Sequence, residues 1–133
     1  VLLIKLDANG SITWQKTFGT ATVDIGVDVI QTTDGGYAVC GLARYEVATS
    51  NKGGIYVFKT NSVGALSWSK MFGEDGWYNA HSIIESLDGG LLVSGIGLSG
   101  KLILIQLTAS GNFQWYRGIM PNNIHTCESS KVI

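Results

Sequence analysis

The sequence predicts an all-β protein made of repeated units of four short antiparallel strands. Three observations carry this prediction. Glycine is frequent and proline is rare, with 18 glycines and 1 proline in 133 residues, and glycine weakens a helix by about 1 kcal/mol per residue. Short apolar runs are separated by glycine-containing turn signals. A tryptophan-bearing stretch also recurs along the chain, which is typical of a repeat architecture.

The recurrent stretch reads IKLDANGSITWQKTFG at 4–19 and FKTNSVGALSWSKMFG at 58–73, with a more divergent copy, IQLTASGNFQWYRGIM, at 105–120. A second block, VIQTTDGGYAVCG at 29–41, matches IIESLDGGLLVSG at 83–95 with the same spacing of 54 residues. Two blocks in one register indicate an internal repeat of about 50 residues. The residues that define it are Gly10, Trp14, Phe18, Gly35, Gly36, Gly64, Trp68, Phe72, Gly89, Gly90, Gly111 and Trp115.

Each repeat contains four expected strands, which we call a to d. We expect strand a at 11–18 and 65–72, strand b at 26–32 and 80–86, strand c at 37–43 and 91–98, and strand d at 1–6, 55–60 and 102–107. Asp-Gly-Gly at 34–36 and 88–90 predicts tight hairpins between b and c, and Asn9-Gly10 predicts one between d and a, because glycine accepts positive φ.

Strands c and d are nearly continuous apolar runs, as in YAVCGLA and LILIQL. This pattern indicates burial on both faces, which a β-propeller blade obtains from its two neighbours. A β-sandwich, the alternative, would show cleaner alternation. We therefore expect one β-propeller domain holding about two and a half blades, with repeat units at approximately 11–64 and 65–111 and partial units at 1–10 and 112–133. Because propellers close with about 4–8 blades, we expect either a segment of a longer protein or a ring assembled from copies. The d–a hairpin is expected to be the seam between consecutive blades.

The repeat is similar to a known group. Lys5-Leu6-Asp7, Gly10, Trp14, Lys16 and Phe18-Gly19, followed by 29–32 and 34–37, resemble β-propeller repeats of large secreted and cell-surface proteins, mostly bacterial. The Asp7…Gly10…Trp14 part also looks like the tryptophan-docking repeat of quinoprotein-type propellers, although the later copies have Asn61 and Thr108 in place of Asp7. The resemblance implies an extracellular or cell-surface location and a role in scaffolding, adhesion or ligand display. No cofactor is carried over, since only structural residues match.

Composition argues against several functions. The formal net charge of −1, with 14% charged residues, does not suit a nucleic-acid binder, which needs a basic patch. No apolar stretch is long and uninterrupted enough for a membrane span. His81 and His125 stand in no recognisable catalytic motif, and no metal spacing is present. We expect neither catalysis nor a metal in this chain, while the activity of a parent protein stays open. For Cys40 and Cys127, buried or unpaired thiols are favoured over a disulfide.

The candidate binding site lies on the face that holds the a–b and c–d connections, because those connections vary between repeats and insertions in repeat arrays often gather on the binding face. The candidate residues are Tyr45, Glu46, Glu74, Asp75, Trp77 and Tyr78. Their aromatic rings would stack on a sugar or pack against a protein partner; the alternative is that they cap the ends of the blades. The three repeated tryptophans are interpreted as packing residues. Asn9 is a possible N-glycosylation acceptor in Asn9-Gly10-Ser11.

These observations predict a non-catalytic extracellular scaffold that assembles with protein partners or with itself. A lectin-like module that binds glycans through the variable face is the first alternative. The non-catalytic part of a larger propeller enzyme is the second.

Overall fold

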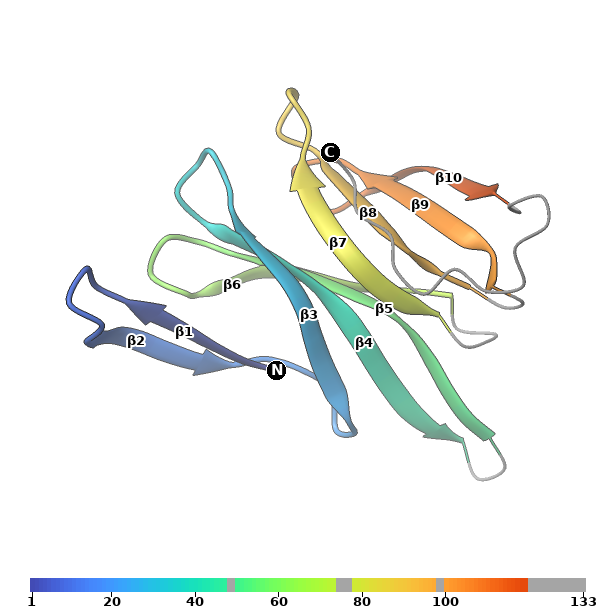
Figure 1. Cartoon of the computed structure of the whole chain (residues 1–133), viewed down its shortest axis with the longest axis horizontal. Helices are drawn as coiled ribbons and strands as arrows, with labels where there is room; N and C mark the ends of the chain where they lie inside the picture. The colour runs from blue at the N-terminus through green and yellow to red at the C-terminus, as the bar shows by residue number, and fades with distance from the viewer. Residues whose placement is uncertain (48–49, 74–77, 98–99, 120–133) are drawn as a thin grey trace.

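A computed structural model of the chain describes residues 1–47, 50–73, 78–97 and 100–119, with side chains described outside 45–47 and 50–52. In these ranges the chain forms ten strands arranged in three antiparallel sheets (Figure 1). The predicted all-β class is confirmed. Two of the sheets have four strands, and each shares strands b, c and d with one of the predicted repeat units.

The strands follow one another within each sheet in chain order. The first sheet contains β1 (Leu2–Leu6) and β2 (Ile12–Thr17). The second sheet contains β3 (Asp24–Gln31), β4 (Tyr37–Val47), β5 (Ser50–Thr60) and β6 (Leu66–Phe72). The third sheet contains β7 (Asn79–Glu85), β8 (Leu91–Ile96), β9 (Leu102–Leu107) and β10 (Phe113–Ile119).

The sheet boundaries differ from the expected seam. The tryptophan strand β6 pairs with β5 and is the fourth strand of the second sheet, as β10 is of the third. The hairpin between strands d and a was expected to join two blades, and this expectation was wrong. Its turn is too tight for the chain to leave the sheet, so the change of sheet falls in the connections from β2 to β3 and from β6 to β7.

The glycine turns share one geometry. In the β1–β2 turn, Gly10 N–H donates to the carbonyl of Asp7 and Asp7 N–H donates to the carbonyl of Ser11. The same two bonds recur in the turns that begin at Thr32, Asn61, Ser86 and Thr108. In each turn the fourth residue is a glycine with positive φ, between 76° and 82°, which is the left-handed position of a type I turn with a G1 bulge. The predicted hairpins are therefore confirmed.

The second glycine of each Asp-Gly-Gly has a different role. Gly36 and Gly90 do not have positive φ. A Cβ on Gly36 would collide with the carbonyl oxygen of Thr60, and one on Gly90 would lie 2.6 Å from that of Leu107. These glycines are needed because strand d passes too close for a side chain.

The c–d connection of the repeat unit at 11–64 forms a longer hairpin. β4 and β5 stay paired from Tyr37 opposite Thr60 to Val47 opposite Ser50. Strand c was expected to end at 43 and strand d to begin at 55, and these bounds were wrong, because the two strands continue their antiparallel ladder past the ends of the neighbouring strands.

The second sheet is buried on both faces. On one face Val39, Ala43, Tyr56 and Phe58 pack against residues of the first sheet. On the other, Ala38, Cys40, Ile55 and Val57 form a larger core with the third sheet. The residues contributed by the third sheet to that core are Ala80, Ile83, Leu91, Val93, Ile103, Ile105 and Leu107. The prediction of two-sided burial is confirmed for β4 and β5, and the three sheets stack in chain order with the second in the middle.

Candidate interaction surfaces

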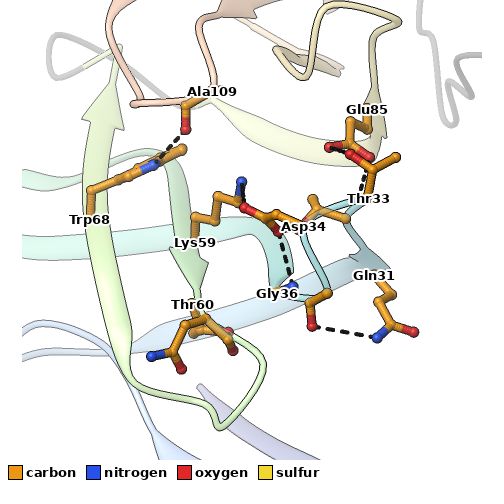
Figure 2. A network of polar contacts seen from close by, with 12 residues as sticks. Gln31, Thr33, Asp34, Gly36, Lys59, Thr60, Trp68, Glu85 and Ala109 are labelled. Atoms are coloured by element: carbon orange, nitrogen blue, oxygen red, sulfur yellow. Dashed lines mark hydrogen bonds and ion pairs between the residues drawn. The ribbon is translucent and has the colours of Figure 1, made fainter.

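Two tryptophans contact the glycine turn of the next sheet. Trp14, in β2, covers the β5–β6 turn, where a Cβ on Gly64 would lie 3.0 Å from Cζ3 of the indole. Trp68, in β6, covers the β9–β10 turn, where a Cβ on Gly111 would lie 2.6 Å from Cδ2 of the indole. The indole N–H of Trp68 also donates a 3.1 Å hydrogen bond to the carbonyl of Ala109 (Figure 2). In the structure, Trp14 and Trp68 therefore each lie against a glycine turn of the following sheet.

The two ends of the stack carry the same two kinds of group, a turn glycine at one end and a strand tryptophan at the other, and both are exposed. Gly10 lies in a turn of identical geometry, yet no atom is within 4 Å of the position its Cβ would occupy. Trp115 occupies in β10 the place that Trp68 occupies in β6, and it is 37% exposed. The guanidinium of Arg117 lies 5.7 Å from the centroid of the Trp115 ring.

Two apolar faces accompany these groups. The first end face is the side of the first sheet that points away from the second; its residues are Leu2, Ile4, Leu6 and Ile12. The last end face is the side of the third sheet that points away from the second; its residues include Leu102, Leu104, Trp115 and Ile119. Leu2 is 58% exposed and Ile119 is 47% exposed, although the repeat places both at positions that neighbouring sheets cover elsewhere.

Polar contacts fasten the second sheet to the third. Glu85, at the end of β7, accepts hydrogen bonds from the backbone N–H and the hydroxyl of Thr33, at 2.8 and 3.1 Å (Figure 2). Asp28 accepts a 3.0 Å bond from the backbone N–H of Ile83, across the core. These bonds hold the two sheets in one register.

An ion pair links a turn to a strand within the second sheet. Lys59 Nζ, on a side chain that is 8% exposed, lies 2.6 Å from Oδ2 of Asp34 (Figure 2). The bond to Lys59, followed by those to Thr32 and the backbone of Gly36, lowers the pKa of Asp34 from 3.8 to about 2. The pair gives the buried ammonium a counter-charge, which makes it a structural feature of the b–c turn.

The structure describes only part of the predicted binding site. Glu74, Asp75 and Trp77 lie outside the described residues. Tyr45 and Glu46 lie in β4, opposite Lys52 and Asn51. Asn9, the possible glycosylation acceptor, is exposed in the β1–β2 turn.

Tyr78 is the predicted site residue with a described side chain. It packs against the larger core and covers Gly73 and Gly97. It also lines an apolar cavity of about 260 Å³ between the second and third sheets. The described residues that line it are Phe72, Gly73, Tyr78, Ile103, Ile105, Phe113 and Tyr116. Sequence reasoning did not select Phe113 or Tyr116, because they become neighbours of Tyr78 only through sheet packing.

The titratable groups of the described residues give little support to a reactive site. Cys40 is a free, buried thiol whose pKa is raised from 9.0 to about 12, first by burial and then by the charge of Asp28. Burial lowers the pKa of His81. No cluster of His, Cys, Asp and Glu able to hold a metal occurs among the described residues. In the same part of the chain, no helix has the length and apolar character that a membrane span requires.

Sequence reasoning also missed the end faces, although a signal for them exists. At the repeat spacing of 54, Leu2, Ile4 and Leu6 correspond to Tyr56, Phe58 and Thr60. These three are 6%, 0% and 0% exposed in the second sheet. Apolar residues at positions that the repeat normally buries therefore indicate a face that needs a neighbour.

The described part of the chain thus belongs to the class of all-β proteins built from stacked antiparallel sheets, with an apolar face at each end. No protein-family model matches the chain, and a search of curated proteins finds no significant relative.

Proposed function

We propose that this chain is a non-catalytic, extracellular assembly module in which propeller-like sheets stack and the end faces bind protein. The observation that carries the proposal is the exposure of positions that the repeat buries elsewhere. Ile4 is 44% exposed, whereas Phe58, its counterpart in the second sheet, is fully buried. The extracellular location rests on the resemblance of the repeats to those of secreted and cell-surface proteins.

Physical considerations favour a protein as the occupant of these faces. Contiguous exposed apolar surface is uncommon on isolated soluble chains and marks interaction sites. Covering it contributes about 25 cal/mol per Å² of apolar area. Each end face is one side of a sheet, which suits another sheet better than a small ligand.

The lectin-like alternative draws on the aromatic cavity beside Tyr78. Aromatic rings stack on sugars, and three aromatic side chains besides Tyr78 line this cavity. Among the described residues, its lining contains no Asp, Glu, Asn or Gln, so tyrosine hydroxyls and backbone groups are the described polar groups that could meet the many hydroxyls of a sugar. Assembly with protein is therefore the better-supported function.

Site-specific photo-crosslinking tests the proposal. A photoreactive amino acid is placed at Ile4 or at Ile119, one on each end face, in the cells that make the protein. The control position is Val63, in the β5–β6 turn, which is 64% exposed but lies off both faces. We expect protein adducts from Ile4 and Ile119 and none from Val63. Equal adducts from all three positions, or none from the end faces together with specific binding on a glycan array, would overturn the proposal.

A further inference from the structure

We propose that the two end faces bind each other, so that copies of this chain associate head to tail with Trp115 of one copy docked on the Gly10 turn of the next. This inference rests on the proposed function and names its partner as a second copy of the chain. The contact between a tryptophan and the glycine turn of the next sheet forms twice within the chain. The first sheet presents such a turn, and the last sheet presents such a tryptophan, without the matching half.

The Gly10 turn has the same shape as the turns on which Trp14 and Trp68 pack. Its two backbone bonds are 3.1 and 2.9 Å, and those of the turn at Gly64 are also 3.1 and 2.9 Å. The φ angles are 82° at Gly10 and 76° at Gly64. Gly64 and Gly111 are buried beneath an indole, whereas Gly10 is exposed. A tryptophan ring could therefore dock on Gly10 without any change of backbone.

Trp115 is positioned to supply the tryptophan ring of that contact. Trp14 pairs across its hairpin with Lys5, Trp68 with Lys59 and Trp115 with Gln106, which are equivalent positions of the repeat. The indole of Trp115 therefore projects from the outer side of the third sheet, as that of Trp68 projects from the second sheet toward the third.

The apolar side chains around the two groups correspond to the two halves of an interface already present in the fold. Tyr56 and Phe58, the counterparts of Leu2 and Ile4, pack toward the preceding sheet. Ile55 and Val57, the counterparts of Leu102 and Leu104, pack toward the following sheet. The last end face of one copy and the first end face of another thus reproduce the contact of consecutive sheets over strands d and a.

A second copy is favoured over an unrelated partner because one chain carries both complementary halves. The two faces differ, so the contact is heterologous: it uses a different surface on each copy and leaves one of each free. Such contacts extend into rings or open chains. The association is therefore directional and grows with protein concentration.

Sedimentation velocity over a concentration series tests this arrangement with matched variants. We expect the wild-type chain to associate. Trp115→Ala and Gly10→Asn should each weaken association by about tenfold or more, the size of a central aromatic contact. Asn is chosen because it tolerates the left-handed conformation. Gly89→Asn is the control, since Gly89 has φ of 77° and a nearest atom at 3.8 Å, in a turn that meets no tryptophan; it should associate like wild type.

Mixing the two deficient variants tests the direction of the contact. Gly10→Asn retains Trp115, and Trp115→Ala retains the Gly10 turn, so an equimolar mixture should form 1:1 dimers and nothing larger. Circular dichroism and urea unfolding confirm that each variant is folded. Monomeric wild type at all concentrations, wild-type association of either variant, or a mixture without dimers would overturn the inference. If the crosslinks from Ile4 and Ile119 then lead to a different protein, this inference fails while the proposed function stands.

Discussion

The indole nitrogen of Trp68 lies 3.1 Å from the carbonyl oxygen of Ala109, and this hydrogen bond ties the last strand of the second sheet to the last turn of the third. The two residues are 41 positions apart in the chain. Together with the packing of the indole over Gly111, the bond makes Trp68 a contact between the second and third sheets. Its side chain also packs against the larger core.

Replacing Trp68 should destabilise the fold more than replacing Trp115. Trp68→Ala removes a half-buried indole and its hydrogen bond, and we expect the free energy of unfolding to fall by about 2 kcal/mol. Trp68→Phe keeps a ring over the turn but loses the bond, for a loss of about 1 kcal/mol. Trp115→Ala should change the monomer by less than about 0.5 kcal/mol. Urea unfolding at low protein concentration measures all three. Equal losses of unfolding free energy for Trp68→Ala and Trp115→Ala would contradict a stabilising contact between Trp68 and the β9–β10 turn.

A series of glycine-to-alanine changes separates backbone strain from docking. Gly10→Ala should cost about 1 kcal/mol, the cost of an alanine in the left-handed region. Gly64→Ala and Gly111→Ala carry the same strain and also push a methyl group into an indole, which adds about 1–3 kcal/mol of overpacking. Thermal or urea unfolding provides the comparison. Three equal losses would show that the tryptophans do not require these glycines.

The Asp34–Lys59 pair should make stability depend on pH in the acid range. Because the pKa of Asp34 falls from 3.8 to about 2 on folding, its contribution is present above about pH 4 and is lost as the pH falls toward about 2. Asp34→Asn keeps the oxygen that accepts from Gly36 but removes the charge. The loss at pH 7 should be about 1 kcal/mol, since solvent reaches the carboxylate. Asp88→Asn is the matched control, because the neutral Gln106 stands at the position of Lys59, and it should cost less. The effect would be refuted if, in the acid range, the free energy of unfolding of the wild type fell with pH no more steeply than that of Asp34→Asn.

Cys40 should be chemically inert in the folded chain. Its pKa of about 12 in place of 9.0 lowers the thiolate fraction at pH 8 by about a thousandfold. In a Cys127→Ser background, iodoacetamide should label the unfolded chain in urea rapidly and the native chain very slowly. Rapid native labelling would show that the core around β4 opens readily.

The sequence predicts the strands well, because each tight hairpin turn has a glycine at a fixed offset and strands c and d are nearly continuous apolar runs. It does not show which strands lack a neighbouring sheet. LILIQL at 102–107 and IYVFKT at 55–60 look alike in sequence, yet β5 is buried along 55–60 while Leu102 and Leu104 are only partly covered. Whether an apolar strand is buried depends on whether another sheet packs against it. The apolar pattern indicates that such packing is favourable but does not show that a sheet is present.

The candidate site was less predictable for a similar reason. Tyr78 was selected from its place in a variable connection, and its side chain turns inward over Gly73 and Gly97. Trp14 and Gly64 were each recognised as repeated residues, but the spacing that unites them, one repeat apart, follows from the stacking of sheets. Contacts between repeats are tertiary, and local patterns do not encode them.

The five glycine turns have a consequence for how this chain can change over evolutionary time. Their first residues are Asp7, Thr32, Asn61, Ser86 and Thr108, yet all five make the same pair of backbone bonds. The side-chain bond that supports the turn comes from Asp7 in the first, from Asn61 in the third and from Thr108 in the fifth. Several chemistries therefore satisfy one geometry, and only the left-handed glycine is constant. Substitutions can accumulate at these sites almost neutrally, so the shape can outlast any similarity that a comparison of sequences would detect.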